Sequence, residues 1–462
     1  MGRQRNPVRT LWFACVVAAL GGFLFGFDMA VVSGILPLVA KQFSLSAFQQ
    51  GWFVSSALVG CIGGVAASGE LGDRYGRRRV LLLAAVLFLV SALGCGLLPT
   101  FPSIVVARIL GGVGVGIASS MVPLYISEIA PANIRGRMVT YYQLAVTLGI
   151  LVAYLSNAFL VQAMSSSMEL SGWIGVWFRE EVWRGMFIVG ALPALVFLLG
   201  LLGIPESPRW LLQKGHTAAG AALLARFVGE TEATADLASR RQQGQRKSSY
   251  RDLFSPQLRK PLLLGLLLPF FSQFCGINAI IYYGPSILSD AGVSLSNSLQ
   301  SQIIFGVANL AFTLIAVWKV DQLGRRPLYL AGTAAAALSL TAVGACMYTE
   351  NTQGLLLLLS VVIFLASFAF SIGPLKFVVA SEIFPSDIRG RAIALSIMVM
   401  WVADTVIGQL TPVLLESIGA GFTFWFFAFW CVFAFIVVYR LLPETKGKSL
   451  EEIEDGWLER NV

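Results

Sequence analysis

Long runs of apolar residues constrain this chain more than any other feature. About twelve such runs, each of roughly 20 residues, alternate with polar stretches. A helix of this length crosses the ~30 Å hydrocarbon core of a bilayer, because each residue adds ~1.5 Å. Only 13 % of the residues are charged, whereas a soluble domain carries about 25 %. The chain is therefore predicted to be an all-α, polytopic membrane protein.

A second feature is an internal repeat. Residues 127–137 read SEIAPANIRGR and residues 381–391 read SEIFPSDIRGR, and each copy follows a long apolar run. A repeat of this kind indicates that one half of the chain is built like the other. We therefore predict twelve transmembrane helices in two pseudo-symmetric six-helix bundles. The expected spans lie near residues 11–35, 47–68, 80–99, 103–126, 139–162 and 184–204, and near residues 261–285, 298–320, 327–347, 354–380, 390–415 and 421–441.

The polar stretches outside the spans set the expected boundaries. Residues 205–260 form the only long polar segment between apolar runs, so we expect a cytoplasmic linker with short helices there. The predicted division is an N-terminal bundle at 1–204, the linker at 205–260, a C-terminal bundle at 261–442 and a cytoplasmic tail at 443–462.

Charge is distributed unevenly between the loops. The chain has a net charge of +8, and its Lys and Arg residues crowd into alternate loops. This is the positive-inside pattern, which places both termini and the linker in the cytoplasm of a multi-pass protein of the plasma or inner membrane. Lipid is the expected surrounding, and neither a nucleic-acid partner nor an obligate protein partner is predicted.

The chemistry-bearing residue types indicate no enzyme. The six cysteines lie in or beside apolar runs without metal-ligand spacing, so they are predicted to be small buried residues rather than disulfides. The sequence has no nucleophile–base pair and no phosphate-binding loop. We therefore expect no catalytic residues, no metal site and no bound cofactor.

Seven motifs, in this order along nearly the whole chain, carry a family resemblance. They are GELGDRYGRR (69–78), ISEIAPANIRGR (126–137), PESPRWL (205–211), QFCGINAIIYYGP (273–285), VDQLGRRP (320–327), SEIFPSDIRGR (381–391) and PETKG (443–447). With them the chain resembles the sugar porters of the major facilitator superfamily. The resemblance implies the major facilitator fold and uptake of a monosaccharide (hexose or pentose) or related polyol, driven by protons through alternating access. The alternative is a passive sugar facilitator, followed by a non-transporting sugar sensor or a drug antiporter.

Asp28 and Arg108 are the predicted proton-coupling pair. Asp28 lies deep in the first span, where a carboxylate costs about 2.5–3.5 kcal/mol and needs a partner. Arg108 in the fourth span is the expected partner, and the resemblance implies that protonation of this Asp drives the conformational change, with the proton as coupling ion. The alternative is a static buried ion pair.

Charged residues near the repeated motif are predicted to form a cytoplasmic gate. Glu–Arg contacts between them would be charge-assisted and would exist only when the inner face is closed. The alternative is positive-inside topology alone, with solvated arginines. The expected gate residues are Arg77, Arg78, Glu128, Arg135, Arg325, Arg326, Glu382 and Arg389.

The predicted sugar site combines amide groups with aromatic faces at the interface of the two halves. Gly276 is expected to let the seventh helix break, and Tyr282 and Tyr283 resemble the outer lid. The alternative is that intramembrane amides only join helices. The substrate-binding residues implied by the resemblance are Gln143, Ser272, Gln273, Asn278, Asn309, Phe377 and Trp401.

Several positions depart from the family pattern and leave the cargo open. Ile150 and Met400 replace polar residues, and Phe377 lacks an indole N–H. Lys376 and Asp404 are unusual charges within the tenth and eleventh spans. They are expected to pair with each other, to line the substrate path, or to reach an interface by snorkelling.

Overall fold

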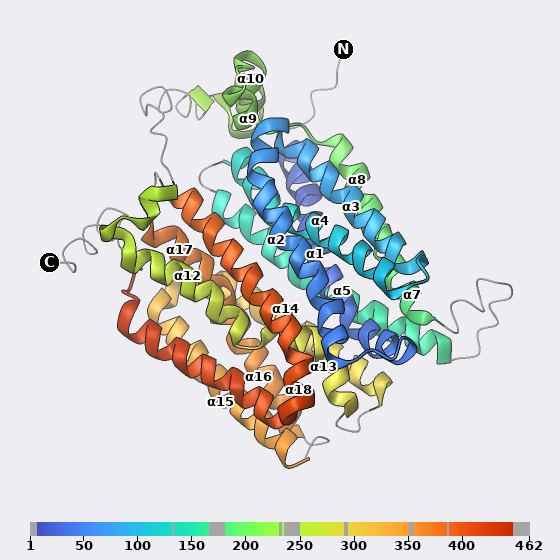
Figure 1. Ribbon diagram of the computed structural model, residues 1–462. Coiled ribbons are helices and arrows are strands. Elements are labelled where there is room, and N and C mark those ends of the chain that lie inside the picture. The colour runs from blue at the N-terminus through green and yellow to red at the C-terminus, as the bar shows by residue number, and fades with distance from the viewer. Residues whose placement is uncertain are drawn as a thin grey trace. The chain divides into compact units, whose positions relative to one another are not determined.

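The computed structural model contains helices and no strands among the residues that it describes (Figure 1). The described residues are 7–131, 134–165, 181–230, 233–234, 250–290, 294–350, 355–385 and 388–446. Eleven helices within these ranges are long and apolar enough to cross a membrane. The last of them, α18 (Arg389–Leu441), has 53 residues and a non-helical Gly419 at φ 82°. Because α18 covers the eleventh and twelfth predicted spans, these eleven helices account for all twelve predicted spans. The expected all-α architecture is confirmed.

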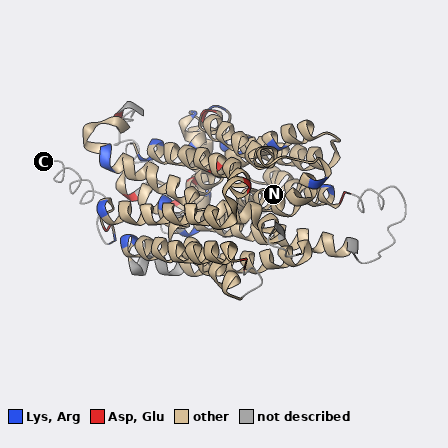
Figure 2. Cartoon of the chain, turned by 60° about the horizontal axis from the view of Figure 1, so that its bottom comes forward, with Lys and Arg blue, Asp and Glu red and all other residues tan. Residues whose placement is uncertain are grey.

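The helices carry few charges along their length. Figure 2 shows that most of the ribbon contains neither Lys and Arg nor Asp and Glu. Many large apolar side chains, such as Phe159, Leu192 and Leu338, are exposed. A soluble surface of this kind would aggregate, whereas a lipid environment accommodates it.

The chain divides into two compact units whose limits differ from the two sequence halves. Parts of three first-half helices, within residues 29–58 and 154–165, belong to the second unit, which also contains the whole described second half. The predicted boundaries at 204/205 and 260/261 therefore stay a prediction. The first unit comprises Met1–Asp28, Val59–Ala153 and Glu180–Lys247, and the second comprises Met29–Leu58, Tyr154–Arg179 and Ser248–Val462.

Within the first unit, α3 (Arg77–Leu97) packs along α4 (Phe101–Ile129) and also contacts α7 and α8. Glycine allows two other helices to approach closely, because a Cβ on Gly26 would collide with the backbone carbonyl of Val146. The remaining helices with residues in this unit are α1 (Pro7–Gln42), α2 (Ala47–Tyr75), α5 (Arg135–Ser165), α7 (Val182–Val189), α8 (Ala191–Gly203), α9 (Pro208–Gln213) and α10 (Thr217–Val228). The last two are short helices within the segment 205–260, whose role as a linker stays a prediction.

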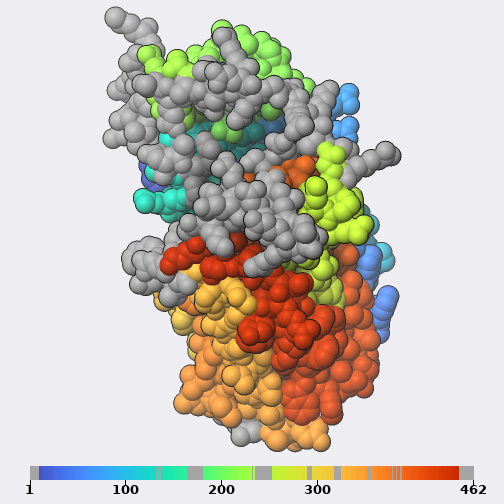
Figure 3. All heavy atoms as spheres, turned by 90° about the vertical axis from the view of Figure 1, so that its left-hand side faces the viewer, coloured from blue at the N-terminus to red at the C-terminus, as the bar shows by residue number. Residues whose placement is uncertain are grey.

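Within the second unit, α18 packs along α15 and α12. Figure 3 shows the orange residues of α15 and the red residues at the end of α18 side by side on one face. A π-helical turn, η3 (Phe368–Ile372), interrupts the tenth span immediately before α17. Turns of this kind are frequent at functional sites. The other elements are η1 (Tyr250–Phe254), η2 (Pro256–Leu258), α12 (Arg259–Phe274), α13 (Ile277–Asp290), α14 (Leu295–Leu323), α15 (Arg325–Tyr348), α16 (Leu355–Ser367) and α17 (Gly373–Ile383).

Candidate functional site

The seventh span is broken at its centre, as the sequence predicts. Helix α12 ends at Phe274, α13 begins at Ile277, and Gly276 between them has φ 85°. A Cβ on Gly276 would lie 2.6 Å from the ring of Phe427, so position and conformation both favour glycine. The break places the polar side chains of Gln273 and Asn278 at the facing ends of two helices of the second unit.

These side chains form one hydrogen-bonded cluster, the amide cluster, which consists of Ser272, Gln273, Asn278, Lys376 and Asp404. Asn278 Nδ2 donates to Gln273 Oε1 and to Asp404 Oδ1, at 2.7 Å each. Gln273 Nε2 donates to Ser272 Oγ over 3.3 Å, and Lys376 Nζ donates to the same oxygen over 3.0 Å. The amide cluster therefore joins three of the predicted substrate residues to both unexplained charges.

Lys376 and Asp404 are buried and linked. Lys376 is 7 % exposed and Asp404 is 3 % exposed. Their charges attract each other. Burial at this level does not fit the snorkelling alternative. The other two alternatives, mutual pairing and a place on the substrate path, both agree with the amide cluster.

The predicted outer lid lies directly against this cluster. Tyr282 Oη donates to Asp404 Oδ2 over 3.2 Å and lies 3.5 Å from Met29 Sδ. Tyr283 Oη donates to the carbonyl oxygen of Gly408. Both tyrosines are fully buried, and their hydroxyls hydrogen-bond the middle of α13 to α18.

The remaining predicted substrate residues are distributed over both units. Asn309 in α14 and Trp401 in α18 are buried within the second unit, and Trp401 lies one turn before Asp404. Gln143 is exposed in the part of α5 that belongs to the first unit. The side chain of Phe377 lies outside the described residues. The structure thus brings Ser272, Gln273 and Asn278 together. Substrate binding stays a prediction for all seven residues.

The predicted proton-coupling residues share the first unit. Arg108 in α4 is 2 % exposed, and its guanidinium carbon lies 5.9 Å from the ring centre of Phe187. Its positive charge acts on the carboxylate of Asp28 in α1. The two residues expected to pair from sequence are therefore electrostatic neighbours in the structure.

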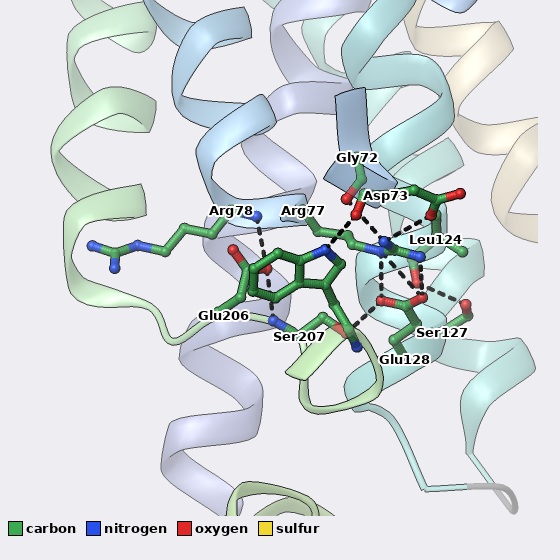
Figure 4. Close-up of polar contacts among 10 residues, drawn as sticks. Gly72, Asp73, Arg77, Arg78, Leu124, Ser127, Glu128, Glu206 and Ser207 are labelled. Atoms are coloured by element: carbon green, nitrogen blue, oxygen red, sulfur yellow. Dashed lines mark hydrogen bonds and ion pairs between the residues drawn. The ribbon is translucent and has the colours of Figure 1, made fainter. Parts of the chain in front are cut away.

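Glu128 of the first copy of the repeated motif belongs to a dense cluster of charged and polar residues (Figure 4). Arg77 Nη2 and Nε donate to Glu128 Oε1 and Oε2, at 3.1 Å each. Ser207 Oγ donates to the same carboxylate, and Arg77 Nη1 also donates to Asp73 Oδ1 at 3.0 Å. Beside it, Glu206 Oε1 accepts the backbone N–H groups of Arg78 and Ser207.

The second copy repeats this arrangement within the second unit. Arg325 Nη2 donates to Glu382 Oε1 over 2.9 Å, and Thr445 Oγ1 donates to Glu382 Oε2 over 2.6 Å. Glu444 accepts the backbone N–H groups of Arg325 and Arg326, at 3.0 Å and 3.1 Å. We call the two sets the first and second Glu–Arg clusters.

The other predicted gate residues have different contacts. Arg78 Nε donates to the carbonyl of Leu201, and Arg326 Nη2 to that of Tyr439. Arg389 donates to the carbonyl of Phe384 within its own motif, and the side chain of Arg135 lies outside the described residues. Sequence reasoning missed the partners Ser207 and Thr445, together with Glu206 and Glu444. The available signal was Pro-Glu-Ser and Pro-Glu-Thr after the last span of each half.

Hydrogen bonds lower the pKa of one of these carboxylates, that of Glu444. Partial burial by itself raises the pKa of Glu444. The backbone N–H groups of Lys446, Arg325, Arg326 and Thr445 together outweigh that effect and lower its pKa below the ordinary value. The ionised Glu444 therefore caps the start of α15, where backbone N–H groups lack partners within the helix.

Comparison with known proteins covers almost the entire chain. The family model described as "Sugar (and other) transporter" matches residues 14–457. The arabinose-proton symporter of Bacillus subtilis is 40 % identical over 443 residues, which cover 96 % of this chain and 94 % of that protein. The D-xylose-proton symporter of Escherichia coli K12 is 36 % identical, with the same coverage of each chain. The inward-open structure of the xylose transporter XylE from E. coli matches with a TM-score of 0.83 and 35 % identity, covering 97 % of this chain and all of that one.

Proposed function

We propose that this chain, which belongs to the sugar transporter family, takes up a monosaccharide or related polyol together with a proton. Membership confirms the resemblance predicted from the motifs, and it identifies a multi-pass membrane transporter rather than an enzyme. The finer proposal is symport of a hexose or pentose by alternating access, with the proton as coupling ion. The observation that supports proton coupling is the electrostatic interaction between Asp28 and Arg108 within the first unit.

Sugar binding is assigned to the amide cluster and its aromatic neighbour. Side-chain amides offer both donors and acceptors to hydroxyl groups, and Ser272, Gln273 and Asn278 present them at a break in the helix. Trp401 supplies a buried aromatic face one turn from Asp404. An interrupted span with convergent polar groups is the usual site of substrate binding in secondary transporters. Gln143, Asn309 and Phe377 remain proposed contributors.

The proposed coupling mechanism uses the electrostatic interaction between Asp28 and Arg108. An ionised Asp28 attracts Arg108 in a medium of low dielectric constant, so this attraction stabilises the conformation in which the two charges are near each other. Protonation neutralises the carboxylate and weakens that attraction. Arg108 is then released, and the equilibrium shifts toward the alternate conformation.

The two Glu–Arg clusters are proposed as parts of the inner gate. Each one ties the cytoplasmic ends of several helices of its own half through charge-assisted hydrogen bonds. Weakening them is expected to favour the inward-open state. Cysteine probes on the cytoplasmic side should become more accessible in Glu382→Gln, which weakens the bonds to Arg325, and unchanged accessibility would count against the gate. The cytoplasmic position of both termini and location in the plasma or inner membrane rest on the loop charges.

The deciding experiment is uptake in proteoliposomes with and without an imposed pH gradient. Radiolabelled D-xylose, L-arabinose, D-glucose and myo-inositol serve as probes. We expect accumulation of at least one sugar only when the gradient is present. Asp28→Asn should abolish accumulation but retain exchange, whereas Glu416→Gln, which alters an exposed carboxylate, should behave as wild type.

Two results would contradict the proposal. Accumulation that persists in Asp28→Asn would exclude this carboxylate as the coupling site. Equal uptake with and without the gradient would identify the passive facilitator instead.

A further inference from the structure

We propose that Asp404 is a sugar-binding residue whose carboxylate accepts hydrogen bonds from adjacent hydroxyl groups, with Lys376 as the positioning residue that balances its charge. The inference deepens the proposed function and rests on it. It assigns the substrate class as a neutral sugar or polyol with at least two neighbouring hydroxyls.

The position of Asp404 is the first argument. It is 3 % exposed and lies on α18 in the eleventh predicted span, where an ionised carboxylate is costly. An intramembrane charge of this kind is expected to have both a partner and a task. Lys376 meets the first requirement, because the two charges attract each other.

The hydrogen bonds of Asp404 are the second argument. Its Oδ1 accepts from Asn278, and its Oδ2 accepts from Tyr282. A carboxylate has about four lone-pair sites. The two bonds therefore orient the group and leave acceptor capacity for sugar hydroxyls.

The way in which the charges join the cluster argues against a static pair. Lys376 reaches Ser272, and Asp404 reaches Asn278, so each charge is bonded to a proposed sugar-binding side chain. Two charges that only joined α17 to α18 would not need these partners. Tyr282 also connects Asp404 to α13, which carries the predicted lid. A sugar bound at the carboxylate would therefore compete with or reorient the hydrogen bond that Tyr282 donates.

This arrangement predicts a specific pattern of selectivity. Hydrogen bonds to an ionised group are stronger than those to a neutral amide, and a site built for hydroxyls rejects analogues that lack them. One or two adjacent deoxy positions should therefore be rejected strongly. A sugar acid should also be excluded, because its carboxylate would face that of Asp404.

The test is sugar counterflow in proteoliposomes without a pH gradient, since exchange does not require coupling. The four probe sugars identify a transported substrate, and its monodeoxy analogues then compete for exchange. In wild type, affinity should fall about tenfold or more for one or two adjacent deoxy analogues. In Asp404→Leu, which keeps the approximate shape but has no acceptor oxygen, the same analogues should bind within about twofold of the parent sugar, as expected when the contact is already absent.

A double variant that removes the charges of both Asp404 and Lys376 keeps the test informative if the single variant does not fold. Asp404→Leu leaves Lys376 uncompensated in the membrane, whereas the double variant Asp404→Leu/Lys376→Met removes both charges. The double variant should also lose deoxy discrimination if Asp404 is a ligand. Glu416→Gln, on the same helix but exposed, should retain wild-type discrimination.

Three outcomes would overturn the inference. They are a wild-type protein that rejects no deoxy analogue, an unchanged deoxy penalty in the folded variants, and recovery of wild-type discrimination in the double variant. Counterflow without proton-driven accumulation would refute only the coupling proposed above. Absence of counterflow for every probe sugar would refute the proposed function and this inference with it.

Discussion

The two Glu–Arg clusters contain the same chemistry at different burial, which permits a matched prediction. The side chains of Arg77 and Glu128 are 5 % and 6 % exposed, whereas those of Arg325 and Glu382 are 13 % and 21 % exposed. Removing one partner of a buried pair leaves the other charge uncompensated, but water compensates a partly exposed one. Glu128→Gln should therefore destabilise the protein more than Glu382→Gln.

The magnitudes follow from the contacts. Breaking a buried ion pair costs about 3–5 kcal/mol. We expect about 3 kcal/mol for Glu128→Gln, because Arg77 keeps its bonds to Gly72 and Asp73 and the new amide still offers one acceptor oxygen. For Glu382→Gln we expect about 1–2 kcal/mol, the value of a hydrogen bond to a charged group.

The assay is the apparent Tm of the purified variants in detergent, measured side by side at one scan rate. Thr445→Val serves as a control for the second cluster, since it replaces the hydroxyl that donates to Glu382 without removing a charge. Its loss in Tm should be smaller than that of Glu382→Gln. Equal losses in Tm for the two glutamate variants, or the reverse order, would refute the argument from burial.

Three further predictions concern Gly276, Glu444 and the six cysteines. Gly276→Ala should impair sugar exchange more than membrane insertion, because both its φ of 85° and the nearby Phe427 ring oppose a Cβ; wild-type exchange would exclude a strained break. Glu444 has a lowered pKa in the folded protein, so its contribution to stability is present above the unfolded pKa and is lost as pH falls through the folded pKa. The acid limb of a Tm–pH profile should therefore flatten in Glu444→Gln, and an unchanged limb would contradict this assignment. All six cysteines are buried and free, so a reductant should leave the apparent Tm unchanged, and a lower Tm would reveal a disulfide.

The elements that the sequence predicts correctly depend on local signals. Hydropathy alone locates the spans, because lipid requires about 20 apolar residues for each one. The break at Gly276 is also visible locally, since a glycine lies between Gln273 and Asn278 in an otherwise apolar run. The eleventh and twelfth spans follow without a loop in the structure, and Gly419 alone separates them.

The features that sequence reasoning left open depend on which helices become neighbours. No hydrophobic force selects partners between helices in lipid, so apolar patterns do not specify that Asp404 on α18 meets Asn278 and Tyr282 on α13. The hydroxyls of Ser207 and Thr445 were missed for the same reason, because each reaches its glutamate from a segment more than 60 positions away.

Features that occur in both halves differ in kind from those that occur once. Gly76 and Gly324 both have positive φ, at 100° and 88°, and each precedes an arginine that binds the glutamate of its repeated motif. Such duplicated contacts fix how helices end at one face of each half, so their loss should alter stability and gating together. Asp28 acts with Arg108 in one unit, and Asp404 joins the amide cluster in the other. Because nothing in the opposite unit duplicates either arrangement among the described contacts, their loss should alter coupling or selectivity separately.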